Sequence, residues 1–170
     1  MTDFRVHADD LHGLSDQELA WKAIEPVYDE LRTPYEPDPR YAELTPGQRA
    51  LYVLHWVRSE VGNGGFDQLF YNSTGMLAAD APTAADLVGA SHQADLLRQA
   101  NSVFPDGRPP GDHEERRRLL AALSDDEMGD LDDLADRLYD LDATPGTALA
   151  SYLAAYVRDN PDEFARGSTA

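Results

Sequence analysis

Cysteine is absent from the 170-residue sequence, which excludes disulfide bonds, thiol chemistry and zinc sites built on cysteine. Long apolar runs are absent too, since no stretch approaches the ~18 consecutive apolar residues of a membrane-spanning helix. The beginning of the sequence, MTDFRVHADD, has neither the basic nor the apolar region of a signal peptide. We therefore expect a cytoplasmic protein that does not associate with a membrane.

Basic residues are scarce: 14 lysines and arginines stand against 32 aspartates and glutamates, for a formal net charge of −18. Each contact with a nucleic-acid phosphate requires a cation, so this charge argues against direct binding of nucleic acid. It favours a basic protein as the partner. Solubility or adaptation to high salt is the alternative explanation, supported by the excess of 22 aspartates over 10 glutamates and by a single lysine, Lys22.

Helical periodicity runs through most of the chain, and no segment shows the sustained alternation of a β-strand. We therefore predict an all-α fold, a single compact domain of about seven helices over residues 15–165. A loose lead-in is expected at residues 1–14 and a frayed tail at residues 166–170. A helix at about residues 46–61 is apolar nearly all round, which is typical of the buried centre of a domain.

Capping and turn residues mark the ends of the predicted helices. Ser15 and Ser124 each begin a capping box, with a glutamate three residues later. Thr83 is expected to cap a further helix, and Thr144 with the proline after it to open the last one. Pro26 should kink or split the first helix. Loops are predicted at residues 33–40 and 104–112, and helices at about residues 16–31, 46–61, 66–72, 84–102, 113–123, 125–141 and 145–159.

The central helix ends at the GNGG sequence of residues 62–65, where glycine allows a sharp turn, and a short aromatic helix follows. One hypothesis makes this break a polar pocket that binds a ligand or carries out catalysis around Glu60, Asn63 and Asn72. The other, which we favour, makes it a structural joint whose asparagines and serine cap helix ends. The residues of this joint are Glu60, Asn63, Gly64, Gly65, Phe66, Gln68, Phe70, Asn72, Ser73 and Gly75.

Acidic residues are densest between Asp125 and Asp142, where nine acids accompany a single base, Arg137. Leucines at helical spacing give this segment a buried stripe, and carboxylates three or four residues apart stand ~5–6 Å from one another on the opposite face. A rigid helix can thus present a row of carboxylates in place of DNA phosphates. The helix dipole accounts for the acids of the first turn, and a solvated acidic face is the alternative for the whole row. The candidate partner-binding residues are Asp125, Asp126, Glu127, Asp130, Asp132, Asp133, Asp136 and Asp140.

Candidate metal ligands and catalytic motifs are few. His7 and His12, with the aspartates between them, are the best metal-binding candidates, but they lie in the weakly patterned lead-in, so no metal or other cofactor is expected. His55 is expected to be a hydrogen-bonded residue of the core. No HExxH, EF-hand, GxSxG or phosphate-loop motif occurs, so we predict that the protein is not an enzyme.

Residues 60–75, EVGNGGFDQLFYNSTG, resemble the signature of the DNA-mimic protein family, small acidic bacterial proteins whose domain is mostly of unknown function. The FPDGRPP loop at residues 104–110 and the NPDEF segment at residues 160–164 agree with this resemblance. The resemblance covers roughly residues 15–165 and implies an all-helical domain. It also implies a negatively charged surface that imitates duplex DNA and occupies the DNA-binding site of a transcription factor.

Three hypotheses for the function remain open. The first is a non-enzymatic acidic protein that binds a basic DNA-binding protein, either a transcription factor or a nucleoid protein, and blocks its binding to DNA. The second is an immunity-like inhibitor of a toxin or nuclease, which would show the same electrostatics. The third is a ligand-binding or enzymatic pocket at the joint. The sequence leaves the oligomeric state open, a homodimer included.

Overall fold

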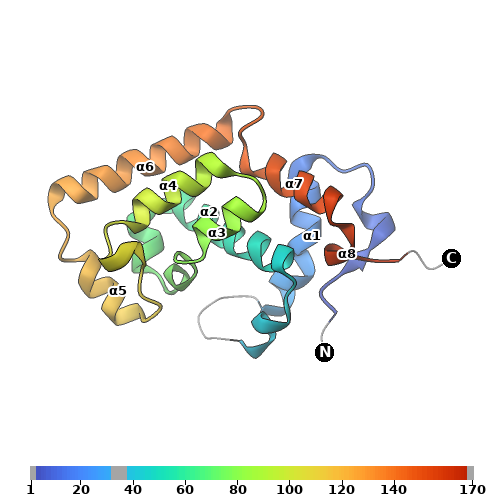
Figure 1. Ribbon diagram of the computed structural model, residues 1–170, viewed down its shortest axis with the longest axis horizontal. Coiled ribbons are helices and arrows are strands. Elements are labelled where there is room, and N and C mark those ends of the chain that lie inside the picture. Colours follow the sequence, from blue (N-terminus) through green and yellow to red (C-terminus); the bar gives the residue numbers. More distant parts are fainter. Residues whose placement is uncertain (1–2, 32–37, 168–170) are drawn as a thin grey trace.

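Helix α2 (Pro46–Tyr71) runs through the middle of the molecule, and most of the other helices pack against it (Figure 1). The structure is a computed structural model that describes residues 3–31 and 38–167. Within these ranges the chain forms eight α-helices and only two strands, of two residues each, so the predicted all-α class is confirmed. The helices around α2 are α1 (Asp16–Leu31), α3 (Ala81–Leu87), α4 (Ser91–Asn101), α5 (His113–Leu120), α6 (Asp125–Ala143), α7 (Leu149–Asp159) and α8 (Pro161–Phe164).

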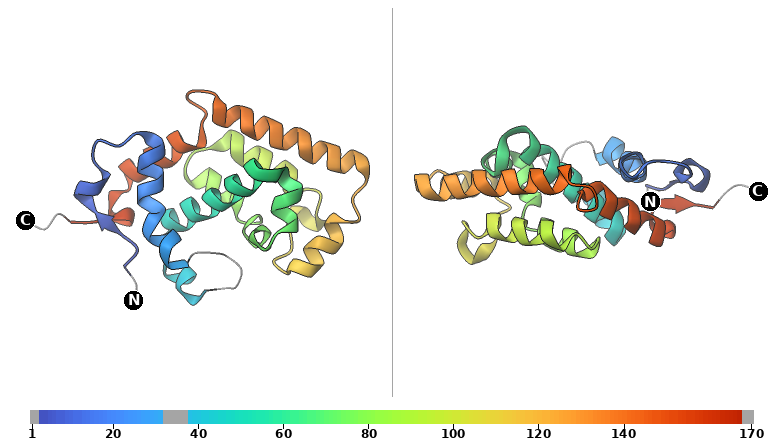
Figure 2. Two further views of the ribbon diagram at one scale, coloured as in Figure 1. Left: turned by 180° about the vertical axis from the view of Figure 1, so that it is seen from behind. Right: turned by 90° about the horizontal axis from the view of Figure 1, so that it is seen from above.

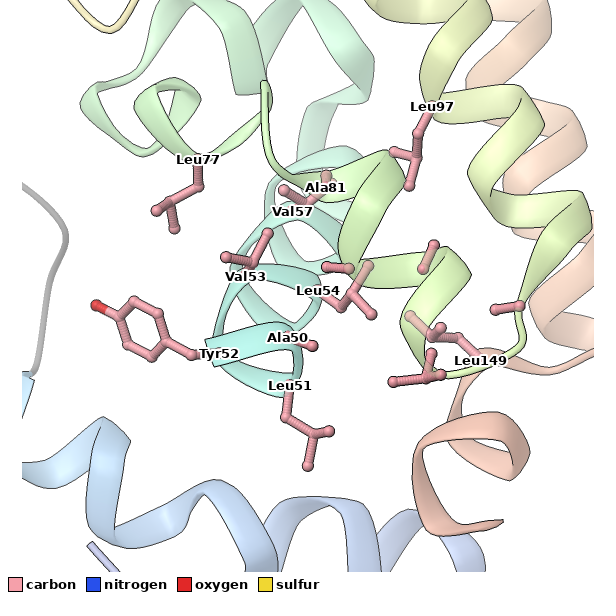
Figure 3. Close-up of a cluster of buried hydrophobic side chains, with 14 of the residues drawn as sticks. Ala50, Leu51, Tyr52, Val53, Leu54, Val57, Leu77, Ala81, Leu97 and Leu149 are labelled. Carbon is pink, nitrogen blue, oxygen red and sulfur yellow. The ribbon is translucent and has the colours of Figure 1, made fainter. Parts of the chain in front are cut away.

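The side chains of α2 are buried on nearly every side. Leu51, Tyr52 and Leu54 are each no more than 2% exposed, and Figure 3 shows them leaving the helix in different directions. The helix begins with a capping box, in which the Thr45 hydroxyl accepts the Gln48 N–H and the Gln48 side chain accepts the Thr45 N–H. The prediction of a buried central helix is confirmed; α2 also includes the short helix predicted at residues 66–72, which follows a kink with non-helical backbone at Gly64 and Gly65.

The two ends of the described chain meet at one end of the molecule (Figure 1). β1 (Val6–His7) pairs in parallel with β2 (Ala165–Arg166), and Val6 lies opposite Ala165. Phe4 is 3% exposed, and its carbonyl accepts a hydrogen bond from the Gln48 side chain. The described part of the expected lead-in therefore contains regular structure and two buried apolar residues, Phe4 and Val6. Strands of two residues are too short to produce a detectable alternation in the sequence.

α1 continues through Pro26, which was expected to kink or split it, so the proline does not split the helix. Its buried side chains include Ile24 and Val27 on either side of the proline, together with Leu31. A proline inside a helix costs ~3 kcal/mol, and burying each large aliphatic side chain contributes about 1.5–3 kcal/mol. Packing of this face against α2 and α7 therefore outweighs the lost hydrogen bond.

The single helix predicted over residues 84–102 is two helices, α3 and α4. α3 begins at Ala81, so Thr83 lies inside it and does not cap it. Gly89, with a φ of +82°, makes the turn that separates the two helices. Val88 and Ala90 on either side of this glycine are buried, and their apolar character made the helical pattern look continuous.

The last long helix, α7, begins at Leu149, whereas Thr144 was expected to open it. Thr144 instead closes α6, where its hydroxyl donates to the carbonyl of Asp140 at 2.8 Å. The first N–H of α7 is satisfied from outside the helix, by the carboxylate of Asp142 at 2.9 Å. A carboxylate seven residues earlier in the chain performs the capping, which local sequence patterns do not detect.

Short 3-10 helices occupy much of the remaining connections. The loop predicted at residues 33–40 lies largely outside the described residues, and the described chain resumes just before one of these helices. None of the helices in the described ranges combines the length and the apolar character needed to cross a bilayer. The 3-10 helices are η1 (Ala8–Leu11), η2 (Pro39–Glu43), η3 (Ser73–Leu77) and η4 (Pro105–Gly107).

Candidate functional site

Helix α6 holds every candidate partner-binding acid and forms one long outer edge of the molecule (Figure 2). The predicted capping box at its start is confirmed, since the Glu127 carboxylate accepts the Ser124 N–H at 2.8 Å and the Ser124 hydroxyl accepts the Glu127 N–H. Leu131, Leu134 and Leu138 are no more than 9% exposed and attach the helix to the core. At ~1.5 Å per residue, the helix is roughly 28 Å long.

The eight candidate acids of α6 are all exposed, and none of them forms an ion pair with another described residue. The basic residues elsewhere in the described ranges pair mainly with acids of other elements, as Arg40, Arg98 and Arg158 do. The one base on this helix, Arg137, is exposed as well. Among the described residues, the negative charge of these eight acids therefore faces solvent without neutralisation by ion pairs.

Asp142, the ninth acid of the helix, has a structural role that distinguishes it from the other eight. Its carboxylate pairs with Arg58 of α2 at 2.5 Å and accepts the Leu149 N–H at 2.9 Å. Its side chain is 16% exposed. Asp142 thus connects three helices, while the eight acids before it contribute charge alone or, in the first turn, charge and capping.

The joint is a sharp change of direction within α2, at Gly64 and Gly65. Gly65 has a φ of 76° and a ψ of −173°, a conformation essentially restricted to glycine. At Gly64 a Cβ would lie 2.2 Å from the amide oxygen of Gln68. The predicted turn is confirmed at these two glycines, whereas Gly62 and Asn63 continue the helix and are exposed.

The Glu60 carboxylate is the polar centre of the joint. One of its oxygens accepts hydrogen bonds from Gln68 and Asn72, each at 2.9 Å, and the other accepts the Thr74 hydroxyl at 2.6 Å. Burial raises the pKa of Glu60, but the three hydrogen bonds outweigh it and hold the pKa below its usual value. Asn72 was expected to cap a helix end; it starts η3 without a side-chain cap, because its amide donates to Glu60 instead.

This arrangement favours a structural role for the joint over a catalytic one. Both oxygens of Glu60 are occupied by donors of the same chain, and a carboxylate with a lowered pKa is a weak general base. Phe66 and Phe70 are no more than 1% exposed and pack with their ring centroids 6.0 Å apart. Phe70 also meets Phe104 edge to face at 4.8 Å, which connects the joint to the predicted FPDGRPP loop.

A buried arginine, Arg116 of α5, completes the joint and was not predicted as part of it. Arg116 is 0% exposed, and its guanidinium donates to the carbonyls of Phe70, Asn72 and Pro110 at 2.7–2.9 Å. These carbonyls include the end of α2, where a positive charge is favourable. Position 75 beside the Arg116 guanidinium requires glycine, because a Cβ there would lie 2.5 Å from the Arg116 Nε. Ser73, which was expected to cap a helix end, is instead the first residue of η3.

A groove lies beside α6, between this helix and α1, with α2 as its floor and the start of α7 at one end. We call it the α1–α6 groove; its volume is about 960 Å³. Trp21, which is 39% exposed, and Tyr139, which is 71% exposed, are two of its lining residues. The acids Asp132 and Asp136 line it as well, and Asn63, Gly64 and Gly65 of the joint form part of its wall.

His55 belongs to an aromatic cluster at the floor of this groove. Its ring centroid lies 5.4 Å from those of Trp21 and Tyr28 and 5.9 Å from that of Trp56. Burial lowers the pKa of His55, and the nearby charge of Arg58 lowers it further. His55 is therefore a neutral ring at pH 7, held by ring contacts where a hydrogen-bonded core residue was expected.

The histidines of the N-terminal segment do not form a metal centre with their neighbours. Across the described ranges, no three histidine, aspartate or glutamate side chains are grouped closely enough to hold a metal ion. His7 lies in β1 and His12 directly follows η1.

Comparison with known proteins adds a different kind of evidence. A protein-family model described as DMP19-like protein matches residues 42–160, well over half of the chain.

The chain belongs to the DMP19-like protein family.

This match overturns the resemblance drawn from residues 60–75, because the family it identifies is a different one from the DNA-mimic proteins. The physical reason lies in what those residues do: they hold one another at the joint, and they contain none of the α6 acids. A similar joint therefore carries no information about the charged surface. No curated protein and no solved structure matches the chain.

Two features of the site were missed from the sequence. Arg116 stands between two acids and two further arginines, which suggested a solvated surface, although it precedes the buried Leu120 by one helical turn. Tyr139 is an aromatic residue in an acidic segment, out of phase with the leucine stripe. Because Tyr139 is out of phase with the buried leucines, its exposure could have been predicted from the sequence.

Proposed function

We propose that the protein binds a basic DNA-binding protein, either a transcription factor or a nucleoid protein, through the exposed carboxylates of α6, and that it thereby keeps this partner from DNA. The role is non-enzymatic, with the carboxylates standing in for the phosphates of DNA. The observation that carries the proposal is the row of eight exposed acids on one straight, well-anchored helix, none of which has an ion-pair partner in the described part of the chain.

The charge density of this helix is close to that of one DNA strand. From Asp126 to Asp140 the helix rises roughly 21 Å and carries seven carboxylates and one guanidinium. That is one net negative charge per ~3.5 Å, against one phosphate per ~3.4 Å of axis on each strand of B-DNA. A surface that binds DNA phosphates with lysine and arginine would meet a comparable series of acceptors.

The distribution of the charge supports recognition over simple adaptation to salt. Nine of the 32 acids of the chain fall on the 19 residues of α6, which is far more than an even spread would place there. The ion pairs of the described chain lie almost entirely elsewhere, so the same helix is also the least neutralised. Each pair of like charges at this spacing lowers helix stability by ~0.2–0.5 kcal/mol. A surface that serves solubility alone has no reason to concentrate such pairs on one helix.

The test is a pull-down from lysate of the source organism at about 50 mM salt, followed by competition with a labelled DNA duplex. The variant that carries Asp126→Asn, Asp130→Asn and Asp133→Asn removes three acids of the row. Its matched control carries Asp106→Asn, Glu115→Gln and Asp159→Asn, three exposed acids on other elements. Both variants change the net charge by the same amount, so only the position of the charge differs.

We expect the unmodified protein and the control to capture a DNA-binding protein and to displace it from the duplex, with affinity that falls steeply as salt rises. The α6 variant should lose this capture. Two outcomes would overturn the proposal: equal capture by both variants, or a captured partner that stays on its duplex at saturating concentration. Capture of a toxin or nuclease without a duplex-binding partner would favour the inhibitor function instead.

A further inference from the structure

The α1–α6 groove contains two exposed aromatic rings that the phosphate-like row of α6 does not use. Trp21 is fixed from behind by ring contacts with Tyr28 at 5.3 Å and His55 at 5.4 Å, and 39% of it remains exposed. Tyr139 is 71% exposed and, within the described chain, makes no ring contact. Aromatic rings that face solvent in a groove are typical of sites that bind another molecule.

The charges that line the groove call for a cationic occupant. Asp132 and Asp136 approach it from α6, and Asp142 does so beside Arg58, with which it is paired at 2.5 Å. His55 contributes no charge at pH 7, because burial lowers its pKa. The lining groups therefore carry three negative charges and one positive charge, and the whole molecule has a formal net charge of −18. A second copy of this chain would bring the same negative charge to the groove, which argues against it as the occupant.

We propose that the α1–α6 groove receives an arginine-rich segment of the protein partner, whose guanidinium groups stack on Trp21 and Tyr139 and bond to the carboxylates of Asp132 and Asp136. Arginine fits this lining better than lysine does, because its planar guanidinium both stacks on aromatic faces and donates two parallel hydrogen bonds to a carboxylate. The volume of about 960 Å³ accommodates several side chains. The identity of the partner as a DNA-binding protein rests on the proposed function.

The groove extends the resemblance to a DNA surface beyond the row of charges. Many DNA-binding proteins place an extended arm in the minor groove and insert arginine side chains there, between two rows of phosphates. Here a groove of negative lining borders the carboxylate row of α6 directly, since Asp132 and Asp136 belong to both. A partner whose main surface binds the row would thus have its arginine-rich arm within reach of the groove.

Two synthetic peptides of 12 residues, one with six arginines and one with six lysines in the same positions, provide the test. Affinity is measured by calorimetry at about 50 mM salt, and the fluorescence of Trp21, separated from that of Trp56 by comparison with Trp21→Phe, reports entry into the groove. The groove variant is Tyr139→Ala, whose side chain is mostly exposed, so the fold should be unaffected. Tyr71→Ala is the matched control, because Tyr71 is 51% exposed and lies outside the groove.

We expect the arginine peptide to bind more tightly than the lysine peptide and to change the Trp21 fluorescence. Tyr139→Ala should weaken binding of the arginine peptide roughly 2–5-fold, the value expected for an exposed cation–π contact, and should change binding of the lysine peptide less. Asp136→Asn should weaken binding of both peptides, and Tyr71→Ala should change neither. Equal affinity of the unmodified protein and Tyr139→Ala for the arginine peptide would overturn the proposal, and so would a change of oligomeric state on Tyr139→Ala without a change in peptide binding.

The groove and the proposed function fail in different ways. If Tyr139→Ala affects peptide binding but the protein captures no partner that it can displace from DNA, the groove binds arginine-rich segments of some other protein and the proposed function is wrong. If the protein displaces its partner from DNA and Tyr139→Ala does so equally well, the row of α6 acts alone and the groove is not part of the interface.

Discussion

A carboxylate row that serves recognition should reduce the stability of the fold that carries it. The critical perturbation is the variant with Asp130→Asn, Asp133→Asn and Asp136→Asn, which keeps side-chain shape and removes three charges from the middle of α6. All three side chains are exposed and form no ion pair in the described chain, so their removal breaks no structural contact. Aspartate and asparagine have similar helix propensities, which leaves charge as the only substantial difference.

The expected magnitude follows from the spacing of the acids along α6. The three substitutions remove six like-charge pairs three or four residues apart and one attraction, between Asp133 and Arg137. At ~0.2–0.5 kcal/mol per pair, the variant should be more stable than the unmodified protein by about 1–2.5 kcal/mol at low salt. For a chain of this size, that corresponds to a rise in melting temperature of roughly 2–10 °C.

Thermal and urea denaturation at about 10 mM and 1 M salt measure this difference. The gain should be present at low salt and nearly absent at 1 M, where the Debye length is ~3 Å. The matched control is Asp142→Asn on the same helix, which we expect to lower stability at both salt concentrations because it breaks the contacts with Arg58 and Leu149. A triple variant that is less stable than the unmodified protein at low salt would refute the reasoning, because the carboxylates would then be stabilising the fold.

Three further predictions concern the joint, each measured as the free energy of unfolding. Arg116→Met should lower it by about 3–5 kcal/mol, because one buried and two partly buried carbonyls lose their donor, and Arg116→Lys should restore only part of the loss. Gly65→Ala should lower it by ~1–3 kcal/mol owing to its positive φ, whereas Gly62→Ala, with nothing within 4 Å of a new Cβ, should raise it by up to about 1 kcal/mol. Glu60→Gln should lower the free energy of unfolding at neutral pH. Because the pKa of Glu60 is lowered in the fold, this loss of stability should stay constant above the unfolded pKa of 4.5 and shrink as the pH falls below that pKa. A deficit that grows on acidification, a stabilising Gly65→Ala or a neutral Arg116→Met would each contradict the structural account of the joint.

Features that depend on neighbouring residues in the chain were predictable from the sequence. The capping box at Ser124 needs only the glutamate three residues later, and its geometry is as expected. The leucine stripe of α6 and the turn at Gly64 and Gly65 follow from local spacing and from the conformational freedom of glycine. The exposure of the candidate acids other than Glu127 follows as well, since they lie out of phase with Leu131 and Leu134; Glu127 is in phase with Leu131 and is exposed in the first turn of the helix.

Features that depend on contacts distant in the chain were not predictable in the same way. Asp142 caps a helix that it does not belong to, so the start of α7 lay beyond local rules. Three adjacent arginines differ only in where they point: Arg116 is fully buried, while Arg118 is exposed. The α1–α6 groove draws its lining from four helices, and neither Trp21 nor Tyr139 has a neighbour in sequence that indicates the other.

The joint and the acidic helix are connected through the packing of α6 against the turn in α2. The Asp132 carboxylate lies 3.9 Å from the position that a Cβ of Gly65 would occupy, and the next residue back, Leu131, is 1% exposed in the core. The turn and Asp132 thus lie side by side in the wall of the α1–α6 groove. The candidate acids of α6 are all exposed, and none of them provides the core packing that Leu131 does. Substitutions at the exposed positions of α6 can therefore change the partner without disturbing the fold, while substitutions at the joint alter the fold, the groove and the orientation of the acids together.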